Sequence, residues 1–186
     1  PRGVEDVIEY TEVLYREKQK MGSTWIWFFI VPTSLLLLII FSYGMYQQFV
    51  RGKPWGDEPL SDSGLAILGG SMIALSLSLP YIFSRMRLEV TVYPGRIEYR
   101  FFPFQIKNRS VPLERIASYE GIEVRPIRDF GGFGIRRRKG EWGYIADGGG
   151  GVRLRLKDGS SLVFSSADPS AFLLALDSAT GGRRTY

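Results

Sequence analysis

The chain has 186 residues, with 24 lysines and arginines against 19 aspartates and glutamates and a formal net charge of +5. It contains no cysteine, which excludes a disulfide framework and thiolate metal sites. It contains no histidine either, which removes the usual general base near neutral pH and the commonest metal ligand. Most hydrolytic and metal-dependent chemistry is therefore disfavoured, whereas chemistry based on carboxylates is not.

The N-terminal segment, residues 1–23, is predicted to be an amphipathic helix beside a membrane. Apolar side chains recur there at helical spacing. They are Val4, Val7, Ile8, Thr11, Leu14 and Tyr15. Acidic residues lie early in the segment and basic residues late, which suits the helix dipole. Such a helix would lie on the membrane, pack on the C-terminal domain or dock on a partner.

Residues 24–46 are predicted to form a first transmembrane helix. The 20 residues from Thr24 to Tyr43 carry no charge. At about 1.5 Å per residue they cover the roughly 30 Å hydrocarbon core of a bilayer. Trp25 and Trp27 at one end and Tyr43 and Tyr46 at the other are typical of side chains at the membrane–water interface.

Residues 65–84 are predicted to form a second transmembrane helix. Small residues recur there at every fourth position, so they share one helix face, where another helix can approach closely. They are Ala66, Gly70, Ala74 and Ser78. The helix that packs on this face would be either the first span or a helix of another subunit.

Residues 47–64 between the spans are rich in turn formers and acids, which predicts an aqueous loop. Basic residues flank the spans mainly on the side of the termini. Five lie on that side (Arg16, Lys18, Lys20, Arg85 and Arg87) and two in the loop (Arg51 and Lys53). We therefore expect an integral protein of the inner (cytoplasmic) membrane, with the loop outside the cytoplasm and both termini inside it.

Residues 85–180 are predicted to form a β domain, followed by a tail, residues 181–186. Apolar and polar residues alternate in 88–93, 96–102 and 152–157, which is the period of a half-buried strand. Asp158-Gly159 is a hairpin signal. Residues 108–127 suggest a further strand pair, in which Pro112 marks a break or an edge. We expect six or seven antiparallel strands.

The last predicted element is a helix that begins after the N-cap Asp168, with Pro169 in its first turn, and ends at Gly181. A single sheet would leave one apolar face in water. The predicted fold class is therefore a membrane α-helical hairpin plus an all-β sandwich or partly open barrel, capped by a C-terminal helix.

This arrangement resembles a pleckstrin-homology-like (PH-like) domain. The chain is similar to a bacterial family of uncharacterised membrane proteins in which two spans precede such a domain, over 20–176. The residues that carry the resemblance are 110–136 and 150–176, with the motif GGFGIR and a GVRLRLKDG hairpin. The resemblance implies fold and topology but little chemistry. The basic loop that holds an inositol phosphate in pleckstrin-homology domains would correspond to residues 93–96, where no such motif occurs.

Two glycine clusters and a basic run stand out in the domain. Gly131–Gly134 does not fit a phosphate-binding loop, because no Lys-Ser/Thr follows it, so we expect a bend between strands. Gly148–Gly151 is expected to be a flexible hairpin end. The basic run is Arg136, Arg137, Arg138 and Lys139. It is a solvated loop, a contact with anionic lipid, or a contact with an acidic patch of a partner subunit; membrane anchorage disfavours nucleic acid.

The sequence therefore predicts a non-enzymatic membrane-anchored interaction protein, an accessory or assembly subunit of a larger membrane complex, for example a respiratory or photosynthetic one. Other integral membrane subunits and membrane lipids would be its partners, with no cofactor, no metal and no nucleic acid. An anionic-lipid-sensing module is the alternative. Catalysis would have to use carboxylates without a recognisable acid–base spacing. These are Glu120, Glu123, Asp129, Glu141 and Asp147.

Overall fold

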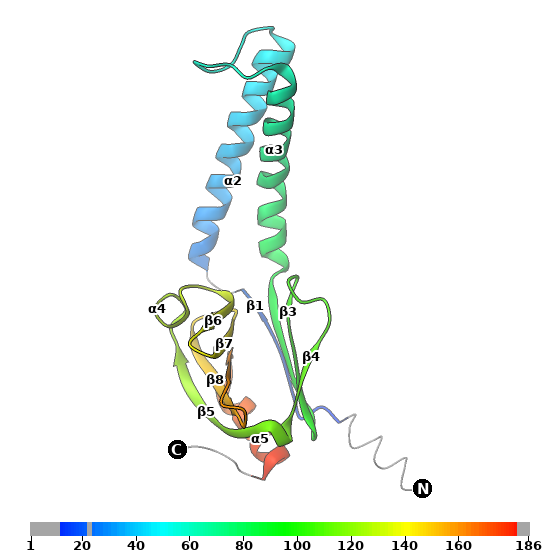
Figure 1. The fold of residues 1–186 in the computed structure, drawn as a ribbon, viewed down its shortest axis with the longest axis vertical. Helices are drawn as coiled ribbons and strands as arrows, with labels where there is room; N and C mark the ends of the chain where they lie inside the picture. The colour runs from blue at the N-terminus through cyan, green and yellow to red at the C-terminus, as the bar shows by residue number, and fades with distance from the viewer. Residues whose placement is uncertain (1–11, 22–23, 182–186) are drawn as a thin grey trace, which may run out of the picture. The chain divides into compact units, whose positions relative to one another are not determined.

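The computed structural model describes residues 12–21 and 24–181. In the first helix, side chains are described from Ile26 onward. The chain divides into two units (Figure 1). One, residues 23–84, is a helical hairpin, and the other, which joins residues 1–22 to residues 85–186, is a β unit. The β unit is thus built from both ends of the chain, with the hairpin inserted between them.

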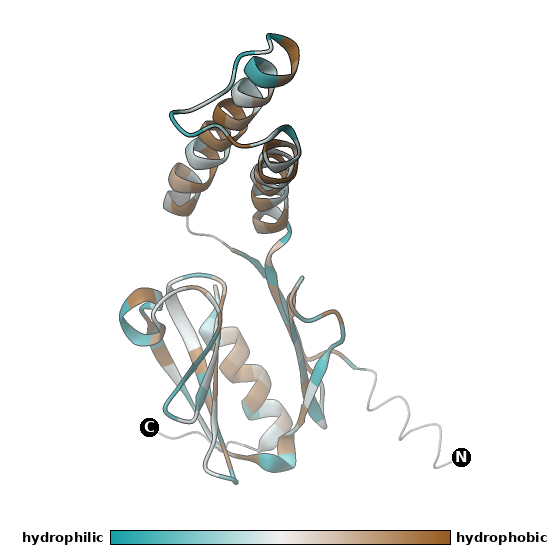
Figure 2. Cartoon of the chain, turned by 45° about the horizontal axis from the view of Figure 1, so that its top comes forward, coloured by the Kyte–Doolittle hydropathy of each residue, from teal (hydrophilic) through white to brown (hydrophobic). Residues whose placement is uncertain are grey.

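The helical unit consists of α2 (Thr24–Met45), which ends in a π-helical turn (Tyr46–Val50), and α3 (Asp62–Arg85). Both helices are long and apolar enough to cross a membrane. Large apolar side chains face outward along them: Phe28 is 74% exposed and Ile67 72% exposed. Figure 2 shows this apolar character as brown along both helices. The two predicted spans are confirmed as helices, and the helical turn extends four residues further than the predicted start of the loop.

The loop between the helices packs back onto α2 through one aromatic side chain. Trp55 lies so close to Gly44 that a Cβ at that position would come within 2.6 Å of the indole ring. The same indole meets Phe41 edge to face, with ring centroids 6.0 Å apart. Gln48 Nε2 donates to the carbonyl of Leu60 at 2.9 Å and so holds the loop closed.

The predicted N-terminal helix is wrong over Tyr15–Lys20, which form a strand, β1; residues 1–11 lie outside the described part. Within β1 alternate residues point inward, and this period of two outweighs the helical spacing of the residues before it. β1 pairs antiparallel with β2 (Arg87–Val92), from Tyr15 opposite Val92 to Lys20 opposite Arg87. The polar inward side chains of β1, such as Glu17 and Gln19, find hydrogen-bond partners in the β unit.

The partners of β1 lie near the C-terminus. Glu17 accepts hydrogen bonds from Ser166 Oγ and from the Ala167 N–H, both at 2.7 Å. Gln19 Oε1 accepts one from Ser165 Oγ at 2.5 Å. Ser165 and Ser166 are buried, so these bonds satisfy polar groups that water does not reach.

The first sheet of the β unit is antiparallel and has the order β1-β2-β3-β4. β3 spans Arg96–Phe102 and β4 spans Arg109–Pro112. The strands predicted from residues 88–93 and 96–102 are confirmed, and their inward residues, such as Leu88 and Phe101, are buried. We call this the four-stranded sheet.

The second sheet has the order β5-β8-β9-β7-β6, and we call it the five-stranded sheet. Its strands are β5 (Ile116–Val124), β6 (Gly134–Arg138), β7 (Glu141–Ile145), β8 (Gly149–Leu156) and β9 (Ser161–Ser165). β9 lies between β8 and β7 and runs parallel to β7. The expectation of a wholly antiparallel domain is therefore wrong for this pair. β8 does not pair with β7, and β9, which is antiparallel to β8, occupies the position between them.

Two further details of strand order differ from the expectation. The structure describes residues 85–181 throughout and places eight strands there instead of six or seven. β4 and β5 do not pair with each other, because the turn Leu113–Arg115 after Pro112 carries the chain from one sheet to the other. The break expected at Pro112 is thus the corner between the sheets.

Helix α5 (Pro169–Thr180) packs against strands of both sheets. The Asp168 side chain accepts from the Ala171 N–H at 2.9 Å, and Gly181 ends the helix with a φ of 67°, as predicted. An aromatic cluster joins both sheets to α5. Phe164 lies 4.9 Å from Tyr99 and 6.4 Å from Phe172, measured between ring centroids.

Short helix α4 (Pro126–Phe130) was not anticipated, and Gly131–Gly134 therefore follows a helix instead of a strand. Phe130 lies on Gly143 of β7, where a Cβ would come within 2.7 Å of the ring. The cluster Gly148–Gly151 is not simply a flexible hairpin end. Gly149–Gly151 begin β8, and a Cβ on Gly151 would come within 2.7 Å of the Phe164 carbonyl oxygen.

Candidate interaction surfaces

The predicted basic patch, Arg136, Arg137, Arg138 and Lys139, lies on β6 and the turn that follows it. All four residues are exposed. β6 is an edge strand of the five-stranded sheet, and Lys139 has a φ of 47° in the turn to β7. The patch is therefore the edge and tip of a hairpin.

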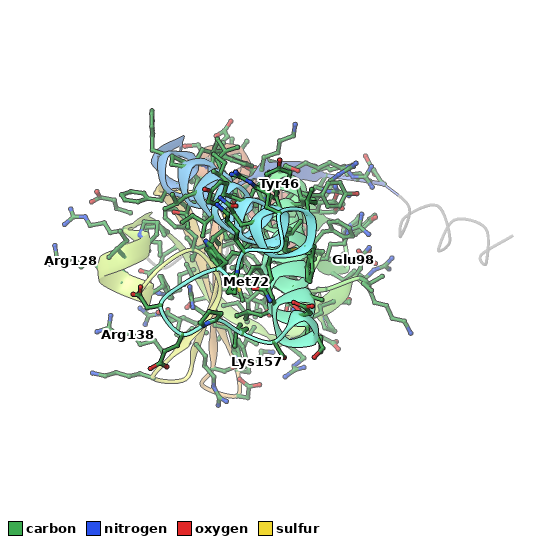
Figure 3. The ribbon with its side chains drawn as sticks, turned by 90° about the horizontal axis from the view of Figure 1, so that it is seen from above. Tyr46, Met72, Glu98, Arg128, Arg138 and Lys157 are labelled. Atoms are coloured by element: carbon green, nitrogen blue, oxygen red, sulfur yellow. The ribbon has the colours of Figure 1, made fainter. Side chains whose placement is uncertain are left out.

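Arg138 binds the end of α4. Its guanidinium donates to the carbonyl oxygens of Asp129 at 2.7 Å and Arg128 at 3.2 Å. These carbonyls belong to the last turn of α4, where backbone acceptors lack helical partners. Figure 3 shows Arg128 and Arg138 on the same side of the β unit. One of the four cations of the patch therefore has a structural role.

The two preceding arginines also make contacts inside the β unit. Arg136 Nε donates to the Phe133 carbonyl at 2.9 Å. The Arg137 guanidinium lies 5.2 Å from the ring centroid of Trp142, its cross-strand neighbour, in a cation–π arrangement. The three arginines of the patch are thus exposed but held in place.

A groove of about 760 Å³ lies beside the patch, on the face of the five-stranded sheet that carries Arg153 and Glu141. Ile122 and Phe130 supply apolar surface, and side chains of both charges complete the lining. The charged ones are Glu123, Asp129, Arg138, Lys139, Glu141, Arg153 and Arg155. The groove therefore has no strong preference for one sign of ligand charge.

Two of the five carboxylates considered for catalysis share Arg153, which lies 3.0 Å from Glu120 and 2.7 Å from Glu141. Burial alone would raise the pKa of Glu120, but hydrogen bonds from Arg153 and Arg155 outweigh it and hold the pKa below its ordinary value. A carboxylate with a lowered pKa is a poor proton donor near neutral pH. The geometry is that of an ion-pair network.

The remaining three carboxylates interact with residues close to them in the sequence. Glu123 lies 2.8 Å from Arg125, whose hydrogen bond lowers the pKa of that exposed carboxyl group. Asp129 accepts from the Arg125 N–H at 2.9 Å, and Asp147 accepts from the Gly148 N–H at 2.8 Å. Within residues 12–21 and 24–181, no three acidic side chains come together as a metal site would need.

A second charged surface lies on the four-stranded sheet. Glu89 is surrounded by Arg100 at 2.6 Å, Arg87 at 2.8 Å and Lys18 at 3.7 Å. Burial would raise the pKa of Glu89, yet the hydrogen bonds from Arg100 and Arg87 lower it overall. The cluster joins β1, β2 and β3. The contribution of Lys18 was not apparent from the sequence, because it depends on β1 being a strand.

Three residues of the predicted small-residue row on the second span, Ala66, Gly70 and Ala74, do not pack on the first span. Ala66 and Ala74 are exposed, and a Cβ on Gly70 would have no neighbour within 4 Å. α2 instead meets a neighbouring face, where a Cβ on Gly69 would come within 3.1 Å of Met45 Sδ. Of the two alternatives left by the sequence, packing of this row against the first span is not what the hairpin shows.

Comparison with known proteins does not identify the chain. No protein-family model matches the chain, and no curated protein matches it. The functional argument therefore depends on the geometry described above.

Proposed function

We propose that this chain is a non-enzymatic, membrane-anchored interaction protein that acts as an accessory or assembly subunit of a larger membrane complex, such as a respiratory or photosynthetic one. The hairpin crosses the inner membrane, and the β unit lies with both termini on the cytoplasmic side. The observation that carries the proposal is the insertion of the hairpin between two paired strands, β1 and β2. The β unit is complete only when both ends of the hairpin return to it.

Because of this insertion, two short connections join the β unit to the membrane hairpin. Lys20 lies opposite Arg87 in the sheet, and the Met21 N–H donates to the Met86 carbonyl at 3.1 Å. α2 begins at Thr24 and α3 ends at Arg85, so only a few residues separate each helix from its strand. A domain held by two short connections stays close to the bilayer, as suits a subunit that binds other membrane proteins.

The exposed apolar surface of both helices supports membrane insertion. Side chains such as Phe29 and Ile39, both 64% exposed, would face water in a soluble protein. A continuous apolar surface of this kind indicates lipid or protein contact. Basic residues at the ends joined to the β unit support a cytoplasmic location for those ends.

The open row of small residues on α3 supports a partner helix. Close helix packing in lipid depends on small side chains, and Ala66 and Ala74 are available on a face that α2 leaves uncovered. A helix of another subunit is the partner that this face fits. Hydroxyl groups such as that of Ser71 bond back to the α3 backbone and need no partner.

The proposal includes a PH-like fold for the β unit. Two packed sheets and a C-terminal helix that contacts both support this assignment. The parallel pair β7–β9 and the added helix α4 depart from a simple PH-like arrangement.

Native purification in mild detergent tests the function. We expect the chain to co-purify with other integral membrane proteins, and Ala74→Leu to weaken that association. Leu68→Phe on the same helix is the control, since Leu68 is exposed on a face of α3 outside the small-residue row. A chain that always runs as a lone monomer, or equal loss with both variants, would contradict the proposal.

The second candidate is an anionic-lipid-sensing module, favoured by the exposure of Lys139 and its neighbours. It is tested on the full chain, because a fragment that begins at Arg87 lacks β1. The chain has no cysteine, so a Lys139→Cys variant carries a single thiol. This thiol should lose reactivity toward a water-soluble maleimide when anionic lipid is added. Unchanged reactivity would remove this candidate.

A further inference from the structure

The loop between β3 and β4, residues 103–108, carries two strongly exposed apolar side chains. Phe104 is 64% exposed and Ile106 is 78% exposed. Within the described part of the β unit, no other large apolar side chain is more exposed than these two. An isolated exposed apolar residue is ordinary, but two at one loop tip suggest a contact.

The loop holds these side chains in a defined arrangement. The Gln105 N–H donates to the Phe101 carbonyl at 2.8 Å, and Gln105 Oε1 accepts from the Phe101 N–H at 3.1 Å. The ring of Phe104 stacks on that of Phe101, with centroids 6.4 Å apart. The tip is thus shaped before it meets any partner, which lowers the entropic cost of binding.

Strand register places the loop at a particular end of the four-stranded sheet. Phe102, the last residue of β3, lies opposite Arg87, and Arg87 lies opposite Lys20. Lys20 ends the strand that leads into α2, and Arg87 begins the strand that follows α3. The loop therefore lies at the end of the sheet where β1 leads into the hairpin and β2 follows it.

Basic side chains lie in the loop and at the strand ends that lead into it. Lys107 is next to Ile106 in the loop, and Lys20 lies on the same sheet end. The Arg87 guanidinium lies 4.7 Å from the ring centroid of Phe102. Apolar side chains flanked by cations are the pattern of segments that lie in a membrane interface, with the cations on anionic headgroups.

We propose that this loop is a third membrane attachment, in which Phe104 and Ile106 enter the headgroup–acyl boundary and Lys107 meets anionic phospholipid. The proposal rests on the membrane anchoring put forward above, because the same leaflet would receive the loop and the hairpin. Two spans alone leave the β unit free to tilt about its connections. A loop in the interface fixes which face of the β unit points toward partner subunits.

Site-specific labelling of the full chain in vesicles tests this inference. The chain has no cysteine, so single variants carry an environment-sensitive fluorophore without background. Ile106→Cys is the test position, and Ile39→Cys reports insertion of α2. Leu174→Cys is the aqueous control. It is 62% exposed on α5, close to Phe172, which stacks on Tyr15 at the opposite end of the four-stranded sheet.

We expect the label at position 106 to shift its emission to shorter wavelength and to be quenched by lipids with a shallow quencher, at a depth of about 5–10 Å. Its shift should grow when phosphatidylglycerol is added to phosphatidylcholine vesicles. The label at position 174 should be quenched by iodide in water and not by lipid. The label at position 39 should respond to a deep lipid quencher.

Three results would overturn the inference, and they separate its failure from that of the anchoring. Lipid quenching at position 39 without quenching at position 106 contradicts the loop attachment alone. Protection of position 106 from iodide without lipid quenching means that protein covers the loop. Absence of lipid quenching at position 39 contradicts the anchoring, and the loop attachment with it.

Discussion

The carboxylate of Glu17 accepts a hydrogen bond of 2.7 Å from the backbone N–H of Ala167, 150 positions further along the chain. This bond joins the strand before the first helix to the segment that leads into the last one. The same carboxylate accepts from the buried Ser166 hydroxyl. Strand β1 is therefore an integral part of the β unit.

Removal of this carboxylate should destabilise the β unit. Glu17→Ala removes the acceptor of the Ala167 N–H and of the buried Ser166 hydroxyl. The loss of an acceptor by a buried hydroxyl costs about 1–3 kcal/mol. Urea unfolding of the chain in detergent, followed by near-ultraviolet circular dichroism, should show a lower midpoint. Glu12→Ala at an exposed position should leave the midpoint unchanged. Equal midpoints for both variants would mean that β1 contributes little.

The aromatic cluster should account for a larger share of stability. Phe172 is fully buried and lies between Tyr15 and Phe164. Phe172→Ala should lower the free energy of unfolding by about 3–5 kcal/mol, because it leaves a cavity where both sheets meet α5. Leu174→Ala on the same helix, at an exposed position, should change it by less than about 0.5 kcal/mol. Similar losses for both would contradict this packing.

Stability should fall in acid partly through Glu89. The folded pKa of Glu89 lies below its ordinary value of 4.5, so its ionised form stabilises the fold above that pH. This contribution is lost as the pH falls through the lower, folded pKa. A series of unfolding midpoints against pH should therefore drop less steeply below about pH 4.5 for Glu89→Gln than for the unaltered chain. Glu114→Gln, at an exposed position, should retain the original slope, and a retained slope in Glu89→Gln would refute the assignment.

The close approach of α4 to β7 predicts a coupled pair. Gly143→Ala places a methyl group against the Phe130 ring and should cost about 1–3 kcal/mol through overpacking. Phe130→Leu should recover part of that loss when the two changes are combined. A double-mutant cycle in unfolding free energy measures this coupling. Simple additivity of the two changes would show that Phe130 does not sit on Gly143 in solution.

The sequence predicted well those elements whose signal is local. Period-two alternation located β2 and β3, and the cap at Asp168 located the start of α5. β1 was missed because its inward residues, such as Glu17 and Gln19, are polar and become inward only through Ser166 and Ser165. Their partners are almost the whole chain away, so no local pattern reveals them.

The candidate surfaces were predicted less completely than the fold. The basic run was identified, but the contact of Arg138 with the end of α4 depends on a five-residue helix that no periodicity could show. The small-residue row on α3 was identified as well. Its exposure was not predicted, because it depends on Met45 packing against a different face of α3, at Gly69. The exposed loop tip at Ile106 became significant only through the register of Phe102 with Arg87.

The central claim is that a two-span hairpin anchors a β unit whose two parts lie on one side of the membrane. Single cysteines at Asp57 in the loop and at Asp158 in the β8–β9 turn test it most directly, with a membrane-impermeant maleimide applied to intact bacterial cells. We expect Asp57→Cys to react in intact cells and Asp158→Cys to react only after the cells are opened. Reaction of Asp158→Cys in intact cells, or recovery of the chain in the soluble fraction without detergent, would contradict the account.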